Sequence, residues 1–180
     1  MIDGRSMLEN ESECYNCGCN LRPVCPNYEG EDKMIVKFVK VSKKAKEPVR
    51  AHPTDAGLDF FYCGDSQVRI DLGESALIPT GIRMEVPSGY MLEIKNKSGI
   101  ASKRHLHVGA CVVDRGYTGE IFVNLHNVGL ETQCIEPGEK LAQGVFVRIA
   151  DHVELLESDS LYGDDLTSRG TGALGSSGDR

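Results

Sequence analysis

Apolar and polar residues alternate in short runs over most of the chain. The first run, MIVKFVKV, begins at Met34, and VRIDL, SALIP, IRMEV, YMLEI, HLHV, ACVV, EIFVNLH and QGVFVRI follow it. A period of two residues is typical of β-strands that bury one face. Turn-forming groups such as PTG, PSG and NVG separate the runs. Many short strands at regular spacing predict an all-β barrel or sandwich.

A sustained helical period is absent from the sequence. The nearest candidate for a short helix is SGIASKR, residues 98–104, and Ser98 is a candidate for its cap. The strand-like alternation decays after Ala150. We therefore expect a polar extension over residues 1–33, a β domain over residues 34–157, and a linker with a glycine-rich arm over residues 158–180.

The composition fits one globular domain with tails. The chain has 180 residues, of which 40% are hydrophobic and 26% are charged. Its formal charge of −7 argues against a protein that coats nucleic acid, but a small anion needs only a few cations and N–H groups. No apolar stretch is long enough to span a bilayer, and the N-terminal residues lack the apolar region of a secretory signal. We expect a cytoplasmic protein, or a nuclear or host-cytoplasmic one if the source is eukaryotic or viral.

The stretch VVDRGYTGEI, residues 112–121, combines groups that suit catalysis. Asp114 lies between two apolar runs and just before Gly116, which predicts a β-hairpin with a carboxylate at its tip. A carboxylate in that place can deprotonate water, and Tyr117 can stack on a flat ring. Taken alone, the pattern Asp-x-Gly favours an ordinary turn over an active site.

The stretch NKSGIASK, residues 96–103, suits a phosphorylated ligand. Lys97 carries a positive charge, Ser98 a hydroxyl, and the backbone from Gly99 opens N–H groups at the start of the expected helix. These groups form a candidate phosphate cradle. An ordinary capped helix is the alternative, and in isolation it is favoured.

Two further stretches carry polar groups among apolar neighbours. In PGEKLAQGVF, residues 137–146, Gln143 either faces solvent or makes a specific hydrogen bond. In PTDAGLDFF, residues 53–61, Asp55 and Asp59 suit a divalent metal beside phosphates. The alternative is that Asp55 only shapes a turn.

Each stretch alone is a weak signal, but their combination and order resemble the trimeric dUTPase family. TDAGLDF resembles the first of the family's five ordered motifs, NKSGIA the second, GACVVDRGYTGE the third, GEKLAQ the fourth and RGTGALGSSG the fifth. The segment SALIPTGIRMEVPSGY is similar in its turns. The resemblance runs from about Met34 to Gly178, which is most of the chain.

The resemblance implies a fold, an assembly and an activity. Family members are jelly-roll-like, distorted β-barrels that form homotrimers, and each active site collects motifs from more than one subunit. The implied reaction is the Mg²⁺-dependent hydrolysis of dUTP to dUMP and pyrophosphate, which limits uracil in DNA and supplies dUMP. Asp114 would be the general base that activates water for attack on the α-phosphorus. The implied partners are dUTP and further copies of the chain, with no direct binding of nucleic acid or membranes.

The resemblance also implies substrate contacts. The phosphates would be held by Lys97, Ser98, Gly99 and Gln143, and by Arg169, Gly175, Ser176 and Ser177 of an arm that closes over the nucleotide. Tyr117 would lie against the deoxyribose. The uracil edge would be recognised by the backbone of the strand that contains Gly109, Ala110 and Val112. Asp59 would belong to the outer shell of a Mg²⁺ ion held mainly by the phosphates.

The sequence departs from the family pattern at three positions. Lys97 replaces a more common arginine, so a planar, two-pronged contact is lost. Leu174 stands where an aromatic residue usually stacks on uracil, which predicts looser closure of the arm. Cys111 replaces a common glycine in the base-recognising strand, and relaxed base specificity stays open as a consequence.

Two other functions are compatible with the same fold. A dCTP deaminase needs a carboxylate in the strand that reads GEIFVNLHN, where this chain has Asn124. An amide cannot shuttle a proton, so hydrolysis is favoured. A catalytically silent nucleotide-binding regulator is the other alternative, and the argument against lost activity is the presence of Asp114, Ser98, Gln143 and Arg169.

The N-terminal extension contains a cluster of cysteines, Cys14, Cys17, Cys19 and Cys25. The spacing C-x2-C can chelate Zn²⁺, but four ligands so close together fit no usual zinc-finger spacing. An unstructured tail with free thiols is the favoured interpretation, and a small zinc module is the alternative. We expect the remaining cysteines, Cys63, Cys111 and Cys134, to pack as small apolar residues.

Overall fold

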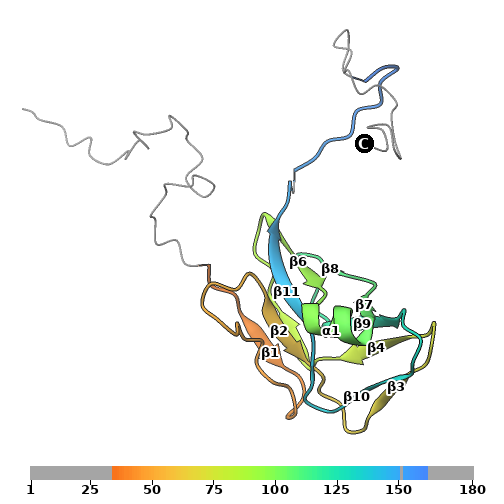
Figure 1. The fold of residues 1–180 in the computed structure, drawn as a ribbon. Coiled ribbons are helices and arrows are strands. Elements are labelled where there is room, and N and C mark those ends of the chain that lie inside the picture. Colours follow the sequence, from red (N-terminus) through yellow and green to blue (C-terminus); the bar gives the residue numbers. More distant parts are fainter. Residues whose placement is uncertain (1–33, 151, 162–180) are drawn as a thin grey trace, which may run out of the picture.

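The structure, a computed structural model, describes residues 34–150 and 152–161. These residues form eleven short β-strands and one α-helix (Figure 1). Every pairing between the strands is antiparallel. The prediction of an all-β fold with one short helix is therefore confirmed for the described part of the chain.

Two larger sheets form most of the body. The first has the strand order β2-β11-β6-β8, with bounds Leu58–Phe61, Lys140–Arg148, Tyr90–Lys95 and Val112–Val113. The second has the order β4-β9-β7, with bounds Ser75–Pro79, Phe122–Asn127 and Leu106–Val108. Strand β11 has nine residues and pairs with β2 on one side and β6 on the other.

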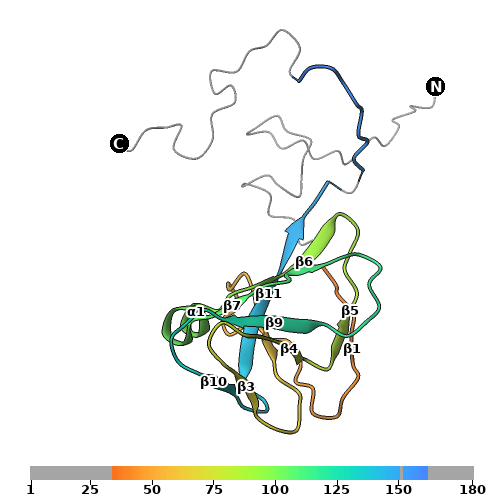
Figure 2. The ribbon, with the colours of Figure 1, turned by 90° about the vertical axis from the view of Figure 1, so that its right-hand side faces the viewer.

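Two small sheets and the helix complete the fold. Strand β1 (Phe38–Lys40) pairs with β5 (Ile82–Met84), and β3 (Val68–Ile70) pairs with β10 (Gln133–Ile135). Helix α1 (Ser98–Arg104) connects β6 to β7. Figure 2 shows the chain leaving the body from the end of β11 in an extended segment, residues 152–161.

The core is built by the alternation that the sequence shows. In β9, Val123 and Leu125 are fully buried while Phe122 and His126 face outward. The other large side chains of the core are Phe60, Ile70, Ile78, Ile82, Leu92, Ile94, Leu106, Ile121, Ile135 and Leu141. Burying one such side chain contributes about 1.5–3 kcal/mol, so the sheets close on one another around this cluster.

Most predicted strands are present but shorter than the apolar runs. The run MIVKFVKV forms a strand only over Phe38–Lys40, and ACVV only over Val112–Val113. Strands β2 and β10 were not among the clear predictions. Each is only three or four residues long and lies between turns, so its apolar–polar alternation is too short to predict a strand.

Two local predictions are wrong. Residues 112–121 do not form a hydrogen-bonded hairpin, because β8 pairs with β6 whereas β9 pairs with β4 and β7. Asp114 does lie at a turn, closed by a hydrogen bond from Tyr117 N to Asp114 O. Ser98 does not cap the helix: Lys97 is the N-cap residue, and it makes no side-chain cap hydrogen bond.

The described part of the chain has no helix with the length and hydrophobicity to cross a membrane. Of the three cysteines in this part, Cys63 is buried and Cys111 and Cys134 are half-buried; all three are free thiols. Burial and the nearby charge of Glu120 raise the pKa of the Cys63 thiol. This agrees with the expected role of Cys63 as a packing residue.

Candidate active site

The phosphate-binding candidates gather where β2, β11 and α1 meet. Asp59 of β2 is buried, and Lys97, at the start of α1, donates a hydrogen bond to its Oδ1 over 2.6 Å. Lys140 of β11 lies 2.7 Å from Oδ2 as an ion pair, although its direction is not that of a hydrogen bond. One carboxylate therefore positions two ammonium groups.

Asp59 is ionised in this setting. Burial alone raises the pKa of its carboxyl, but contacts with Lys140 and Lys97 outweigh burial, and the pKa lies below its ordinary value. The charge of this carboxylate is thus already balanced by two lysines. No cluster of three or more His, Cys, Asp or Glu side chains suited to a metal occurs among residues 34–150 and 152–161. Asp55 accepts a hydrogen bond from His52 N over 3.0 Å and shapes the turn before β2.

Gln143 makes a specific hydrogen bond rather than facing bulk solvent. Its Nε2 donates to the backbone oxygen of Asn96 over 2.9 Å, which ties β11 to the loop before α1. Gly57 lies so close that a Cβ there would overlap Gln143 Oε1 and lie 2.9 Å from Gln143 Cβ. The first, second and fourth motif-like stretches thus meet at one place.

A β-bulge puts the key side chains of β11 on one face. The register between β11 and β2 shifts between Lys140 and Ala142, and Gln143 then lies opposite Asp59. In a regular strand, residues three apart point to opposite faces. With the bulge, Lys140 and Gln143 both reach the side of the sheet where Asp59 lies.

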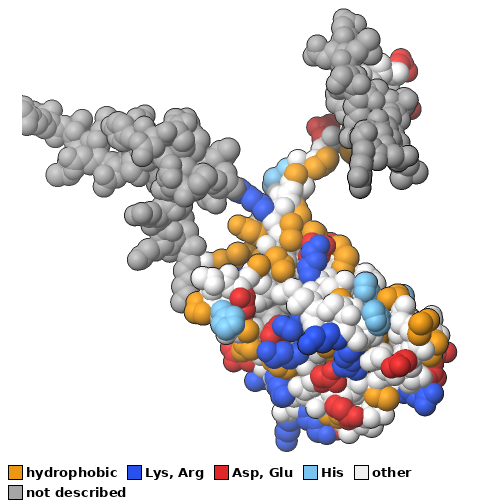
Figure 3. Space-filling model, viewed as in Figure 1, with side chains coloured by type: hydrophobic (Ala, Val, Ile, Leu, Met, Phe, Trp, Pro, Cys, Tyr) orange, Lys and Arg blue, Asp and Glu red, His pale blue; other side chains and the backbone are white. Residues whose placement is uncertain are grey.

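Figure 3 shows Lys and Arg side chains gathered on the face over β2, β11 and α1. Lys46 belongs to this region: it donates to Gly138 O over 2.8 Å and lies 5.2 Å above the Phe61 ring. Lys140 lies 5.9 Å from the same ring. An acidic chain therefore presents a locally cationic face, which attracts polyanions over short range.

Asp114 lies in a second group, at the end of β8. It is exposed and borders a cavity of about 170 Å³ together with Ala110, Val112 and Tyr117. A cavity of about 150 Å³ is enough for a benzene ring, so this one has room for one six-membered ring. Cys111 and Phe122 also line it.

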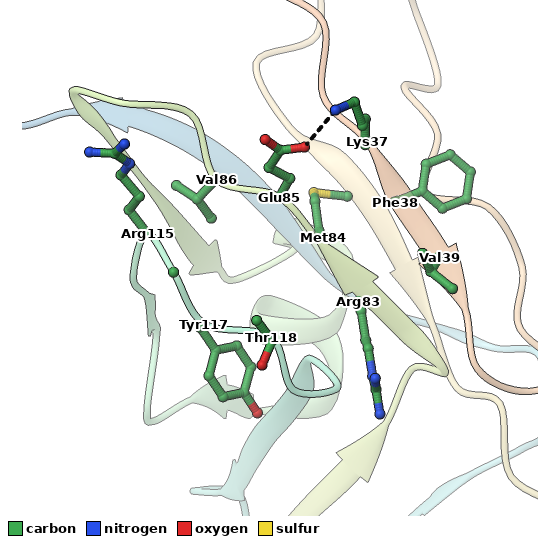
Figure 4. A pocket seen from close by; sticks show the side chains of 11 residues that line it. Lys37, Phe38, Val39, Arg83, Met84, Glu85, Val86, Arg115, Tyr117 and Thr118 are labelled. Atoms are coloured by element: carbon green, nitrogen blue, oxygen red, sulfur yellow. Dashed lines mark ion pairs between the residues drawn. The ribbon is translucent and has the colours of Figure 1, made fainter.

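Tyr117 separates this cavity from a larger groove. The groove has a volume of about 520 Å³ and runs between β1, β5 and residues 115–118 (Figure 4). Its walls carry apolar Met84 and Val86 and an ion pair of 3.5 Å between Lys37 and Glu85. The Tyr117 hydroxyl donates to Glu120 O over 2.8 Å, which fixes the ring between the two hollows.

The structure brings the predicted residues together as two groups. No hydrogen bond or ion pair in the described ranges joins the side chains of Asp114 or Tyr117 to those of Lys97, Ser98 or Gln143. The residues predicted for the C-terminal arm, Arg169, Leu174, Gly175, Ser176 and Ser177, and the cysteines Cys14, Cys17, Cys19 and Cys25 lie outside the described residues.

Sequence reasoning missed several residues of this site. Lys140 stands inside the fourth motif-like stretch, and only the bulge aims it at Asp59. Asn96 accepts from Gln143 with its backbone and from Val108 N with its side chain, over 2.7 Å. In the sequence, only the position of Asn96 next to Lys97 indicated that it belongs to the site.

Comparisons with known proteins agree on one family. The family model described as dUTPase matches residues 43–178. Deoxyuridine 5'-triphosphate nucleotidohydrolase of Mus musculus is 36% identical over 148 residues, which cover 82% of this chain and 88% of that protein. The protein of the same name from Chlamydia trachomatis serovar L2 is 35% identical over 144 residues, with coverages of 79% and 97%.

Solved structures lead to the same family. Staphylococcus bacteriophage 80alpha dUTPase with dUPNHPP matches with a TM-score of 0.73 and 29% identity, covering 81% of this chain and 99% of that one. A mutant dUTPase from phage phi11 of S. aureus, in which a structural Mg(II) ion is coordinated, has a TM-score of 0.66 and 28% identity, with coverages of 72% and 99%. The jelly-roll-like β fold expected from the sequence is thereby confirmed.

Proposed function

The chain belongs to the dUTPase family, and from this premise we propose that it hydrolyses dUTP to dUMP and pyrophosphate with Asp114 as the general base. One observation carries the role of Asp114. Its exposed carboxylate lies at the edge of a cavity that fits a single ring, beside Tyr117. A base must lie within reach of a bound substrate and of the water that it activates, and an exposed carboxylate at the edge of this cavity supports that role.

The chemical step follows from that position. The Asp114 carboxylate accepts a proton from a water molecule as the water oxygen attacks the α-phosphorus. A new P–O bond forms, and the bond between the α-phosphorus and the oxygen bridging to the β-phosphorus breaks. Pyrophosphate leaves with that oxygen, and dUMP keeps the oxygen from water.

The residues that gather around Asp59 and the start of α1, namely Lys97, Ser98 and Gln143, would hold the phosphates. The N–H groups at the start of α1 and the Ser98 hydroxyl donate to phosphate oxygens, and Lys97 adds positive charge. Gln143 and Lys97 are both fixed by hydrogen bonds before substrate arrives. Such preorganisation reduces the ordering that binding would otherwise require.

The second group would select the sugar and the base. Tyr117 presents its ring beside the cavity and disfavours a 2′-hydroxyl by lying against the deoxyribose. Ala110 and Val112 line the ring-sized cavity, and their backbone would recognise the uracil edge. Cys111 lies in the same wall, so its side chain affects the fit of the base.

Magnesium would enter with the substrate, as the Mg²⁺ complex of dUTP. The only buried carboxylate of the described residues, Asp59, is already paired with two lysines. This arrangement fits an ion held mainly by phosphate oxygens and water, with Asp59 no closer than the outer shell. When bound, Mg²⁺ neutralises charge on the phosphates.

We also propose a homotrimer with shared active sites. No hydrogen bond or ion pair joins the side chains of the two groups within the described part of one chain, which fits a site completed by a neighbour. Outward apolar side chains, including Leu77 (61% exposed), are available for burial between subunits. The arm at residues 169–178 would close over the nucleotide, where Arg169, Ser176 and Ser177 contact the terminal phosphates.

The test is pyrophosphate release from dUTP, dCTP, dTTP and UTP with Mg²⁺. We expect release from dUTP alone, and its loss in Asp114→Asn. Glu47→Gln is the matched control, because Glu47 is an exposed carboxylate without an ion pair among the described residues. If Asp114→Asn still releases pyrophosphate from dUTP, Asp114 is not the general base. Release of ammonia from dCTP would show that the chain is a deaminase and not a hydrolase of dUTP. If no nucleotide yields pyrophosphate or ammonia, a catalytically silent binding protein is favoured.

A further inference from the structure

Two side chains of β9 lie directly behind the turn that forms one wall of the ring-sized cavity. Gly109 N donates to the backbone oxygen of Asn124 over 2.9 Å. A Cβ at Gly109 would overlap both Asn124 Oδ1 and His126 Nε2. A residue with a Cβ could not lie this close to the two side chains, so glycine at position 109 lets the backbone of the turn pack directly against Asn124 and His126.

The Asn124 amide is held in one orientation. Its Oδ1 accepts from Ala110 N over 3.2 Å, and its Nδ2 points at Ala76 O over 3.5 Å. A backbone N–H can only donate and a backbone carbonyl can only accept, so these two partners fix which end of the amide faces the turn.

His126 completes the arrangement. Its Nε2 lies 2.8 Å from Asn124 Oδ1. Because that oxygen can only accept, the histidine must carry its hydrogen on Nε2. Two donors, one from His126 and one from Ala110, thus converge on a single oxygen of Asn124.

Ala110, the residue whose N–H is held by Asn124, belongs to the cavity wall. Ala110 lines the same cavity as Asp114 and Tyr117. A wall of backbone N–H and C=O groups distinguishes a ring carbonyl from a ring amino group only while its peptide planes keep their orientation. Asn124 and His126 touch that wall from outside the cavity; neither of them lines it.

We propose that Asn124 and His126 are positioning residues that hold the Gly109–Ala110 turn in the shape that selects uracil over cytosine. This proposal rests on the proposed dUTP hydrolysis, since it concerns the base that the site accepts. The two residues act through the backbone of the turn and touch no reacting atom.

A direct test of positioning needs no substrate. Asn124→Ala removes the acceptor of the Ala110 N–H, and hydrogen exchange at that amide should become about three- to tenfold faster, as expected for one lost hydrogen bond. Asn124→Asp keeps an oxygen in place and should keep the slow exchange. His107→Asn is the matched control: His107 lies opposite His126 in the register of β7 and β9, and its side chain makes no hydrogen bond to a described residue.

The second test is base selection by the same variants. We expect Asn124→Ala to reduce the ratio of kcat/KM for dUTP to that for dCTP by about three- to tenfold. Asn124→Asp should restore most of this ratio, and His107→Asn should leave it unchanged. His126→Phe, which keeps a flat ring but loses the donor, should reduce the ratio, and His126→Gln should retain more of it.

The two tests separate the possible failures. If both kcat/KM values fall equally in Asn124→Ala, the residue is merely structural and the proposal is wrong. Unchanged exchange at Ala110 in Asn124→Ala also overturns it, whatever the activity. If the wild-type chain releases no pyrophosphate from dUTP, the proposed function fails, and the base-selection proposal fails with it. Faster exchange would then show only that Asn124 holds the turn.

Discussion

Asp59→Asn is the change from which most can be learned about the phosphate side of the site. The substitution keeps the shape of a buried side chain and removes its charge. In the wild-type chain, Lys97 Nζ lies 2.6 Å from Oδ1 and Lys140 Nζ lies 2.7 Å from Oδ2. An asparagine can accept from one lysine through its remaining oxygen, but its amide nitrogen then faces the other ammonium group.

The expected cost follows from these two contacts. A hydrogen bond to a charged partner contributes about 1.5–3 kcal/mol. The Lys97 and Lys140 side chains are 28% and 45% exposed, so water replaces part of what the carboxylate supplied. We expect a loss of about 2–3 kcal/mol in the free energy of unfolding, which corresponds to a fall in Tm of about 4–12 °C.

The assay is urea unfolding at pH 7 with EDTA, so that no Mg²⁺ contributes. Lys97→Met and Lys140→Met supply a double-mutant cycle: in either background, Asp59→Asn should cost less than in the wild-type chain. Stability equal to or above that of the wild type would refute the role of this pair. A loss seen only in Mg²⁺-dependent hydrolysis would instead place Asp59 in the outer shell of the metal.

The pH dependence of unfolding gives an independent check that ionised Asp59 stabilises the folded chain. The pKa of Asp59 is lowered in the folded chain. Its stabilising contribution is therefore complete above the unfolded pKa of about 4 and is lost as the pH falls through the lower folded pKa. The stability difference between wild type and Asp59→Asn should be constant from pH 6 to 8 and shrink below about pH 4. A difference that grows toward low pH would contradict this account.

Three further predictions follow from the site and the sequence. Gly57→Ala should displace Gln143, lowering kcat/KM for dUTP about three- to tenfold, and the effect should vanish in a Gln143→Ala background, as steady-state kinetics would show. Leu174→Phe should lower KM for dUTP, because an aromatic ring on a base contributes about 1–3 kcal/mol, and unchanged kcat and KM would refute this. Metal analysis of the purified chain should find less than one Zn²⁺ per chain, whereas one equivalent that is lost in Cys14→Ser would establish the zinc module in residues 1–33.

The sequence was sufficient to predict those strands in which the apolar–polar alternation continues over several residues. In β6, apolar side chains recur every second residue from Tyr90 to Ile94, and in β9 Val123 and Leu125 continue the apolar repeat that begins at Ile121; both strands occur where expected. The start of α1 and the turn at Asp114 were also expected correctly. What the alternation could not show was the pairing of strands: β8 and β9 are neighbours in sequence but belong to different sheets.

The fine geometry of the site depends on a feature that no local pattern reveals. A strict two-residue period would place Lys140 and Gln143 on opposite faces of β11, and the bulge between Lys140 and Ala142 brings them to the same face. The pairing of Asp59 with two lysines likewise joins residues 38 and 81 positions apart in the chain. Such contacts follow from the packing of the sheets and not from propensity.

The place of β11 has a mechanical consequence. It is clamped by β2 and β6, and the chain leaves the body directly from its end, where Ile149 N donates to Gly89 O over 2.9 Å. A pull on the C-terminal segment would load β11 lengthwise, first in shear against β6, which pairs with it up to Arg148, and then against β2, which pairs with it over Lys140 to Gly144. Tension in the segment that follows Ile149 therefore acts along a central strand of the sheet that carries Gln143, and not on an edge strand.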